Sequence, residues 1–281
     1  MNKTLGFYYF VHNIIQYEYP LVESVRSINP IADEIVICEC DSSDNTMQVL
    51  RELQAEVGDK LKIVYHSWVT DFRELSVLGN YAADFLSTDW KWHFQADEVL
   101  HENQHDIVLA FINEIAPKYE VHGIPVEAIT TQYNHFLGNY STCFKFCYQE
   151  IPRIKKAGSA WKLSGDACHL DYGRLDTVLR SNITVYHYGK VHNGKTGWKK
   201  EWDFQQLFIT EGFPDPKMQQ MKEKFGEEFC DYVYLFQQDI KDGKTWKFEG
   251  THPEVMKDRI QKFKDEGWEQ FNSKLIEGVN L

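Results

Sequence analysis

Acidic and hydroxyl side chains gather where an apolar run in the first half of the chain ends. In Asp33–Thr46, residues dense in Ile and Val pass into a turn rich in Asp and Ser, and Glu39 lies inside the end of the run. Carboxylates and hydroxyls at such a place accept hydrogen bonds from the diol of a ribose or the edge of a base. Asp44 and Thr46 are equally typical of a helix cap. Glu39 is therefore the stronger candidate for a ligand contact.

A second stretch, Trp90–Leu100, is aromatic and contains two adjacent carboxylates, Asp97 and Glu98. Hard divalent cations prefer carboxylate oxygens, and Mg²⁺ or Mn²⁺ commonly bridges a carboxylate to the phosphates of a substrate. Asp97 is the candidate ligand, whereas Glu98 is expected to point away or to serve the loop. The same residues, Gln-Ala-Asp-Glu, are also typical of a helix start, and this alternative stays open.

The elements that must position these residues alternate between strand and helix patterns. Such alternation predicts an α/β fold with a mainly parallel sheet, in which ligands gather at the carboxyl ends of the strands. The expected strands are Thr4–Val11, Glu34–Cys40, Leu61–His66 and Trp90–Gln95, and the expected helices are Pro20–Asn29, Asp44–Val57 and Phe72–Leu86.

After Lys118 the strands become irregular, and helical patterns follow from Trp198, including Glu227–Ile240 and Pro253–Gly267. The sequence thus predicts a catalytic and ligand-binding domain over residues 1–197 and a C-terminal helical extension over 198–281. The last helices are expected to pack on the sheet domain or to mediate self-association, which leaves a homo-oligomer open.

Taken together, the two acidic stretches resemble family 2 glycosyltransferases of the GT-A fold. Those proteins look like V-x-N-E, DEIVVVD-x-GS-T-D-G-T, RN and W-x-x-x-LDADE in this order. The chain offers four counterparts over roughly its first hundred residues: Val11-His12-Asn13, Asp33–Thr46, Gly79-Asn80 and Trp90–Glu98. The resemblance implies a Rossmann-like GT-A domain and a metal-dependent, inverting hexosyl- or pentosyltransferase that uses a nucleotide-sugar and Mn²⁺ or Mg²⁺.

The departures from the family pattern bear on activity. Glu39 stands where the family has an Asp that contacts the nucleoside, and Gly79 replaces the usual Arg before Asn80. Gln95 replaces the first Asp of the Asp-x-Asp motif, so only Asp97 remains. By resemblance the second carboxylate is the one closest to the metal, and Gln95 faces the ribose. The donor-binding residues implied in this way are Asn13, Glu39, Asn80, Gln95 and, near the diphosphate, Lys190 with Arg153 as an alternative.

Two later residues take roles through the same resemblance. His187, near the end of the apparent strand Asn182–Lys190, matches a late His that relatives bring to the metal, although a His on a strand is also a common structural residue. Asp166 lies where inverting relatives carry the base that deprotonates the acceptor, and a turn Asp after Gly165 explains it equally well. Acceptor contacts are expected from Trp161, His169 and Trp198, and either Trp can instead belong to the core.

The formal net charge of −12 argues against a general polyanion binder. Residues 143–200 are an exception, with eleven Lys/Arg against four Asp/Glu and a net charge of +7. This segment suggests a phosphate site, either for the donor or for a phosphorylated acceptor, and Lys199 and Lys200 are predicted on the acceptor. A solvated face is the plain alternative. Aromatic residues interleaved with the basic ones also permit a nucleic-acid acceptor, as in enzymes that decorate modified bases.

No run approaches the ~18 apolar residues of a membrane helix, and the first residues lack the extended apolar region of a signal peptide. We therefore expect a cytoplasmic protein without a membrane span. Six cysteines without a Cys-x-x-Cys pair fit a reducing compartment, and Cys38 and Cys40 are expected to pack as small apolar residues. A competing class is a GT-A-like nucleotide-sugar or glycan-binding protein without catalysis, which Gln95 favours.

Overall fold

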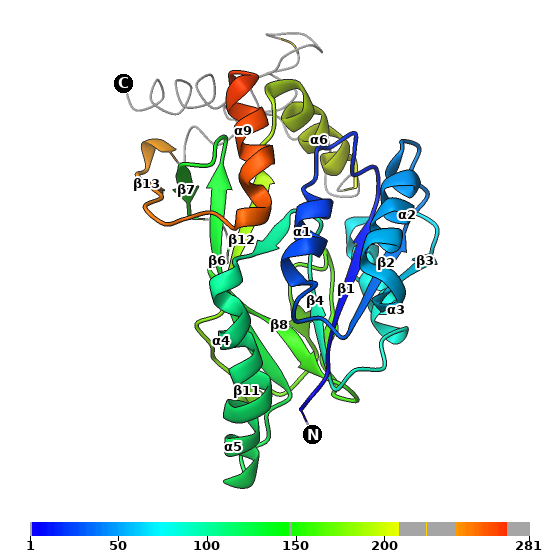
Figure 1. Cartoon of the computed structure of the whole chain (residues 1–281), viewed down its shortest axis with the longest axis vertical. Coiled ribbons are helices and arrows are strands. Elements are labelled where there is room, and N and C mark those ends of the chain that lie inside the picture. The colour runs from blue at the N-terminus through cyan, green and yellow to red at the C-terminus, as the bar shows by residue number, and fades with distance from the viewer. Residues whose placement is uncertain (1, 146–147, 208–222, 224–239, 269–281) are drawn as a thin grey trace.

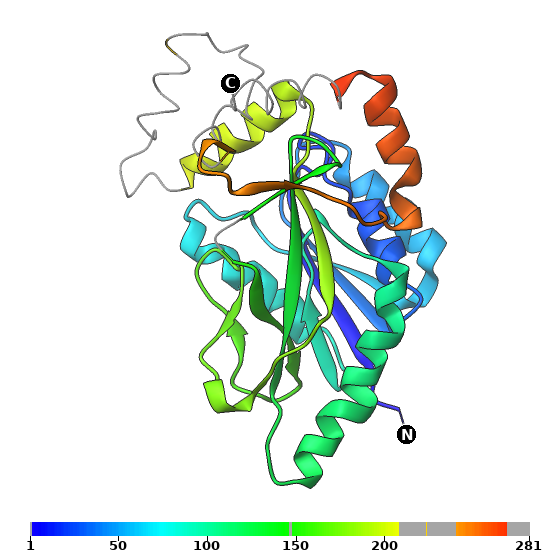
Figure 2. The same ribbon diagram turned by 90° about the vertical axis from the view of Figure 1, so that its left-hand side faces the viewer.

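The computed structural model describes residues 2–145, 148–207, 223 and 240–268, and in it a central sheet carries helices on both faces (Figures 1 and 2). The first half alternates strands and helices as predicted, and β3, β2, β1 and β4 lie side by side in parallel. The chain thus has the expected α/β architecture. The bounds are β1 Leu5–Val11, α1 Leu21–Ile28, β2 Glu34–Glu39, α2 Thr46–Val57, β3 Leu61–Tyr65, α3 Leu75–Asp84 and β4 Trp90–His93.

Side-chain alternation along β1 divides the core into two layers. Phe7 and Tyr9 pack with the apolar residues of α1 and α2, whereas Tyr8 packs with those of α3 on the opposite face. Cys38 of β2 and Cys40, just after the strand, share the α3 face as expected, are fully buried and are not disulfide-bonded. A central strand that is apolar on both faces explains why the sequence reads there as a continuous hydrophobic run.

The middle of the chain extends the sheet with mixed pairing. β8 is antiparallel to both β4 and β6, whereas β12 is parallel to β6 and antiparallel to β5. The bounds are β5 Glu98–Leu100, α4 His105–Ala110, a π-helical turn Phe111–Ile115, α5 Ala116–Val121, β6 Ala128–Leu137, β7 Thr142–Phe144, β8 Glu150–Lys156, β9 Lys162–Leu163, β10 Leu170–Asp171, β11 Val178–Leu179 and β12 Thr184–Lys190.

A β-bulge interrupts β12. His187 lies opposite His135 and Lys190 lies opposite Leu137, so three steps along β12 match two along β6. The pairing of β12 with β5 also places His187 opposite Glu98, and Tyr188 donates its backbone N–H to the carbonyl of Asp97 at 2.8 Å. Strand pairing therefore brings the 95–98 segment beside the end of β12.

The described C-terminal elements are α6 Gly194–Gln206, β13 Thr245–Lys247 and α9 Lys257–Asp265. β13 pairs with β7, and Arg259 of α9 donates to Glu23 of α1 and to the carbonyls of Glu18 and Tyr19. α9 thus packs on the sheet domain, the first of the two alternatives. The predicted boundary at 197/198 falls inside α6, and the division into two domains stays a prediction. The expected helix Glu227–Ile240 lies outside the described residues except for Ile240.

Candidate active site

A cavity of about 330 Å³ lies at the carboxyl ends of β1, β4 and β12, the edge where the parallel sheet was expected to bind a ligand. Its walls come from the end of β1, the 95–97 turn after β4, the 166–168 loop, the end of β12 and one side of α6. Of the residues singled out from the sequence, the cavity brings together Gln95, Asp97, Asp166, His187 and Lys190.

Asp97 and His187 face each other in the wall of this cavity, with Oδ1 and Nε2 3.5 Å apart. Hydrogen bonds behind His187 define which ring nitrogen carries the proton. The carbonyl of Tyr148 can only accept, so Nε2 of His135, 3.0 Å away, must be protonated. Nδ1 of His135 then accepts from Nδ1 of His187 at 3.2 Å. The lone pair of neutral His187 is therefore on Nε2, directed at Asp97.

This arrangement calls for a cation between the two side chains. Burial is the main cause that lowers the pKa of His187, to about 4, so its ring is neutral at pH 7. The pKa of Asp97 is held at about 2, against the rise that burial alone would cause, because the His187 ring, which is protonated at so low a pH, and Lys200 lie beside it. A lone pair and a carboxylate facing each other repel unless a cation lies between them. The donor pair thus fits Mg²⁺ or Mn²⁺.

Gly189 keeps the space between the two ligands open. A Cβ at this position would lie 2.5 Å from Oδ2 of Asp97 and 2.6 Å from Cε1 of His187. Within residues 2–145, 148–207, 223 and 240–268, no three His, Cys, Asp or Glu side chains converge on one point. A metal here would have two protein ligands, and phosphate oxygens and water would complete its shell, as is usual for Mg²⁺.

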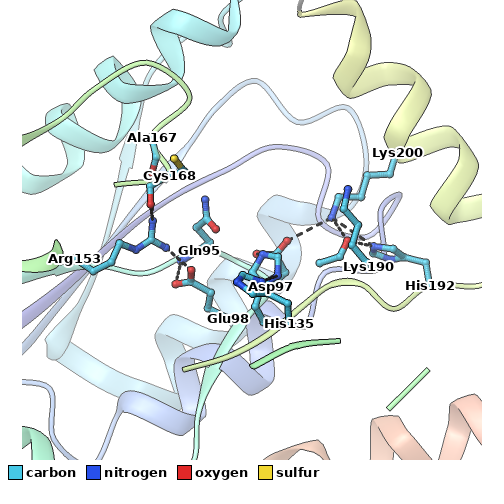
Figure 3. A network of polar contacts seen from close by, with 12 residues as sticks. Gln95, Asp97, Glu98, His135, Arg153, Ala167, Cys168, Lys190, His192 and Lys200 are labelled. Carbon is cyan, nitrogen blue, oxygen red and sulfur yellow. Dashed lines mark hydrogen bonds and ion pairs between the residues drawn. The ribbon is translucent and has the colours of Figure 1, made fainter. Parts of the chain in front are cut away.

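Lys200 of α6 reaches into the same wall from the other side of Asp97 (Figure 3). Its ammonium donates to the carbonyl of Gly189 at 2.8 Å and to Oδ2 of Asp97 at 3.4 Å, and it lies 4.3 Å from the centre of the Tyr19 ring. The residue is only 8 % exposed. Lys200 therefore lies at the end of the cavity that holds Asp97, and its binding to an acceptor phosphate stays a prediction.

The positive charge of residues 143–200 is largely compensated in the folded chain. Among the described side chains, seven basic residues of the segment form ion pairs, and five of those pairs use carboxylates outside the segment: Arg153–Glu98, Lys156–Glu120, Lys190–Glu201, Lys199–Asp203 and Lys200–Asp97. The remaining two pairs are Arg174–Asp176 and Arg180–Glu150. Among the residues that the structure describes, this segment therefore does not form the broad basic surface that a nucleic-acid acceptor requires.

Glu98 and Arg153 form an ion pair in which both side chains are fully buried. Arg153 also donates to the carbonyls of Ala167 at 3.3 Å and Cys168 at 2.5 Å, and Glu98 accepts from the backbone N–H of Gln95 at 3.0 Å. Burial raises the pKa of Glu98 to about 7, although Arg153 opposes the rise. Glu98 points away from the cavity and serves the loop, as expected from the sequence, whereas Arg153, the alternative contact for the diphosphate, is fully buried in this pair and does not line the cavity. The pair connects the 95–98 segment to the 166–168 loop (Figure 3).

Asp166 borders the cavity at the start of that loop, and its Oδ1 accepts from the N–H of Cys168 at 3.1 Å. The carbonyl of Gly165, the preceding residue, accepts from Ser76 at the start of α3. The loop is therefore tied to α3 on one side and to Arg153 on the other. Both predicted roles of Asp166 remain compatible with this position, because a turn Asp can also face a ligand.

Asn13 and Glu39 lie next to the cavity without lining it. Asn13, with a left-handed φ of 51°, accepts from the N–H of Ser43 at 2.7 Å and contacts Nε2 of His12 at 2.9 Å. Glu39 accepts from the N–H of Ser42 at 2.7 Å. Asn13 thus joins the end of β1 to the 41–46 turn, and Glu39 stabilises the start of that turn. His12, which Asn13 contacts, is stacked on Trp68 at 4.2 Å, and both of these rings line the cavity.

Four other predicted site residues are not brought to the cavity. Asn80 exchanges two hydrogen bonds with the backbone of Leu163, at 2.9 and 3.0 Å, so its amide is occupied in joining α3 to β9. Trp161 is 2 % and Trp198 5 % exposed, so neither offers a ring face to an acceptor. His169 contacts Sγ of Cys168 at 3.0 Å and does not line the cavity. We leave these four out of the proposed site.

No helix in the part of the chain that the structure describes is long and apolar enough to cross a membrane. No protein-family model matches the sequence, and no curated protein sequence matches it. Among solved structures, the chain is similar to residues 1–349 of TarS from S. aureus in complex with UDP-GlcNAc, at 10 % identity and a TM-score of 0.44 over 85 % of this chain and 76 % of that one. It is also similar to glucosyl-3-phosphoglycerate synthase from Mycobacterium tuberculosis with Mn²⁺, UDP and glucosyl-3-phosphoglycerate, at 14 % identity and a TM-score of 0.40 over 76 % and 82 %. At these scores we draw nothing about activity from the similarities.

Proposed function

We propose that the protein is a metal-dependent glycosyltransferase that moves a sugar from a nucleotide-sugar to an acceptor hydroxyl. The observation that carries the proposal is the neutral ring of His187, whose lone pair faces Asp97 in a cavity at the carboxyl edge of the sheet. A cation site of two ligands next to a cavity is suited to a diphosphate. The resemblance of the first hundred residues to family 2 glycosyltransferases supports the same reading.

In this proposal Asp97 and His187 hold Mn²⁺ or Mg²⁺, which when bound neutralises the negative charge that develops on the leaving diphosphate. Gln95 lines the cavity two residues before Asp97 and can donate to a ribose hydroxyl. The stacked rings of His12 and Trp68 offer an aromatic face to the base. Lys190 is held by Glu201 at the same wall and is a further contact for the donor.

The transfer step assigned to this chain is the removal of the acceptor proton. As the acceptor oxygen bonds to the anomeric carbon, the bond from that carbon to the diphosphate breaks with its electron pair staying on the diphosphate, and Asp166 takes the hydroxyl proton. Attack from the face opposite the leaving group gives inversion. The Glu98–Arg153 pair positions the loop that carries Asp166 relative to the 95–98 segment, because Arg153 binds the loop and Glu98 binds the segment.

A panel of UDP-, GDP- and other nucleotide-sugars, with and without Mn²⁺, tests the proposal by thermal shift. At least one donor should stabilise the wild type only with Mn²⁺, and Asp97→Asn should lose that shift. Asp258→Asn on the exposed side of α9 removes the same charge at a residue that does not line the cavity and is the control. Failure of the whole panel with Mn²⁺ present would overturn the proposal. Binding without Mn²⁺-dependent hydrolysis or transfer would instead identify a nucleotide-sugar-binding protein without catalysis.

A further inference from the structure

The ammonium of the buried lysine of α6 has one N–H group for which the described residues supply no oxygen or nitrogen acceptor. Its ammonium carries three N–H groups. One donates to the carbonyl of Gly189 and one to Oδ2 of Asp97. Nε2 of His192 lies 3.4 Å away, but it must itself be protonated because it donates to the same Gly189 carbonyl at 2.9 Å. Among the described residues, the third N–H of Lys200 has no oxygen or nitrogen acceptor. The ammonium lies 4.3 Å from the centre of the Tyr19 ring, a weaker interaction than a hydrogen bond to an anion, and the residue lines the cavity.

The two carboxylate oxygens of Asp97 point in different directions, one toward the proposed metal position and one toward the ammonium of Lys200. Oδ1 lies 3.5 Å from Nε2 of His187, where the metal is proposed, and Oδ2 lies 3.4 Å from the ammonium of Lys200. A metal and the ammonium would thus be bridged by one carboxylate, at adjacent points of the same wall. A diphosphate has enough oxygen atoms to contact both cations at once.

We propose that Lys200 is a second cation of the donor site, which binds the diphosphate of the nucleotide-sugar beside the metal. This inference rests on the proposed glycosyltransferase function. When the bond between the anomeric carbon and the diphosphate breaks, the electron pair stays on the phosphate oxygen, and Lys200 donates a hydrogen bond to it without giving up its proton. α6 would accordingly be a donor-binding element rather than part of an acceptor surface.

A purely structural role for Lys200 predicts a different outcome from this one. In that case its ammonium would only join α6 to Gly189 of β12, and its loss would weaken the metal and the donor alike by loosening Asp97. As a second cation, Lys200 repels the metal across Asp97 but attracts the diphosphate. Its removal should then change the two affinities in opposite directions.

The experiment compares Lys200→Met with wild type and with Lys199→Met, the adjacent exposed lysine that pairs with Asp203. Binding of Mn²⁺ alone is measured by electron paramagnetic resonance, and binding of the nucleotide-sugar selected by the panel is measured calorimetrically at saturating Mn²⁺. For Lys200→Met we expect tighter Mn²⁺ binding, by roughly threefold or more, and donor binding weakened about 10- to 100-fold, the usual loss for a hydrogen bond to a charged group. Lys199→Met should leave both affinities unchanged.

Donor affinity unchanged in Lys200→Met, or Mn²⁺ affinity unchanged or lowered, would overturn the inference. Near-ultraviolet circular dichroism checks that the variant is folded, and Lys200→Arg, which keeps the charge, should recover part of the donor affinity if Lys200→Met proves unstable. A wild type that binds no nucleotide-sugar with Mn²⁺ would instead mean failure of the proposed function. The two failures are therefore separable.

Discussion

Replacing Glu98 by Gln should destabilise the protein far more than its place beside the metal ligand suggests. Glu98 and Arg153 are both 0 % exposed, and removing one partner leaves a guanidinium buried without a counter-charge. Loss of one member of a buried pair costs about 3–5 kcal/mol. For a chain of this size that corresponds to a melting temperature lowered by about 6–20 °C. Arg153 would still donate to the carbonyls of Ala167 and Cys168, so the loop should loosen rather than detach.

The assay is thermal unfolding followed by circular dichroism, with Asp176→Asn as the matched control. Asp176 pairs with Arg174, but their side chains are 65 % and 75 % exposed, and an exposed pair contributes only about 0–1 kcal/mol. The double variant Glu98→Met, Arg153→Met removes both buried charges and should be less destabilised than Glu98→Gln. If Glu98→Gln melts within about 2 °C of Asp176→Asn, the pair is not a buried ion pair and our reasoning is refuted.

Three further predictions concern the metal site and its surroundings. Gly189→Ala should fold but weaken Mn²⁺-dependent donor binding about tenfold or more, because its Cβ would lie 2.5 Å from Asp97; an unchanged thermal shift with Mn²⁺ would contradict this. Burial lowers the pKa of His187 to about 4, so its ring stays neutral and can bind a metal in mildly acidic solution. Mn²⁺-dependent stabilisation by a nucleotide-sugar should therefore persist at about pH 5 and vanish as the pH approaches 4. Loss of that stabilisation centred near pH 6.5, the ordinary pKa of a histidine, would show that the ring is solvated. Asn80→Ala should lower the free energy of unfolding by about 1–3 kcal/mol through its two bonds to Leu163, with donor affinity unchanged in calorimetry; reduced affinity would restore its predicted donor role.

The parallel half of the sheet could be predicted because its strands are buried on both faces. β1 and β2 show up as unbroken runs of Ile, Val and aromatic residues, and the helices between them carry apolar residues at helical spacing. β8 gave no such signal. It contains Pro152 and the inward-facing Arg153, whose charge is balanced by Glu98, 55 residues away in sequence. A period-two pattern cannot reveal a strand whose core residue is an ion.

The candidate site divides in the same way. Asp97 and His187 were singled out because carboxylates and imidazoles at strand ends are recognisable by type and by resemblance. His135 orients the ring of His187 from 52 residues away in sequence, and the ammonium of Lys200 lies beside Asp97 from 103 residues away. Only strand pairing and helix packing bring these residues together. Asn80 failed to reach the cavity because its amide is used by Leu163, a contact 83 residues apart. Whether a candidate residue reaches the cavity therefore depends on contacts between distant parts of the sequence, which residue type alone does not reveal.

The bulge in β12 makes the site depend on the number of residues between His187 and Lys190. In a regular strand, positions three apart point to opposite faces, yet His187 and Lys190 both border the cavity. The extra residue resets the alternation between them, so the metal ligand and the basic residue depend on one particular count of residues. Deleting any residue between them would turn one side chain away, even where every remaining residue type is kept. During evolution an insertion or deletion within this short segment would therefore be selected against while the site is in use.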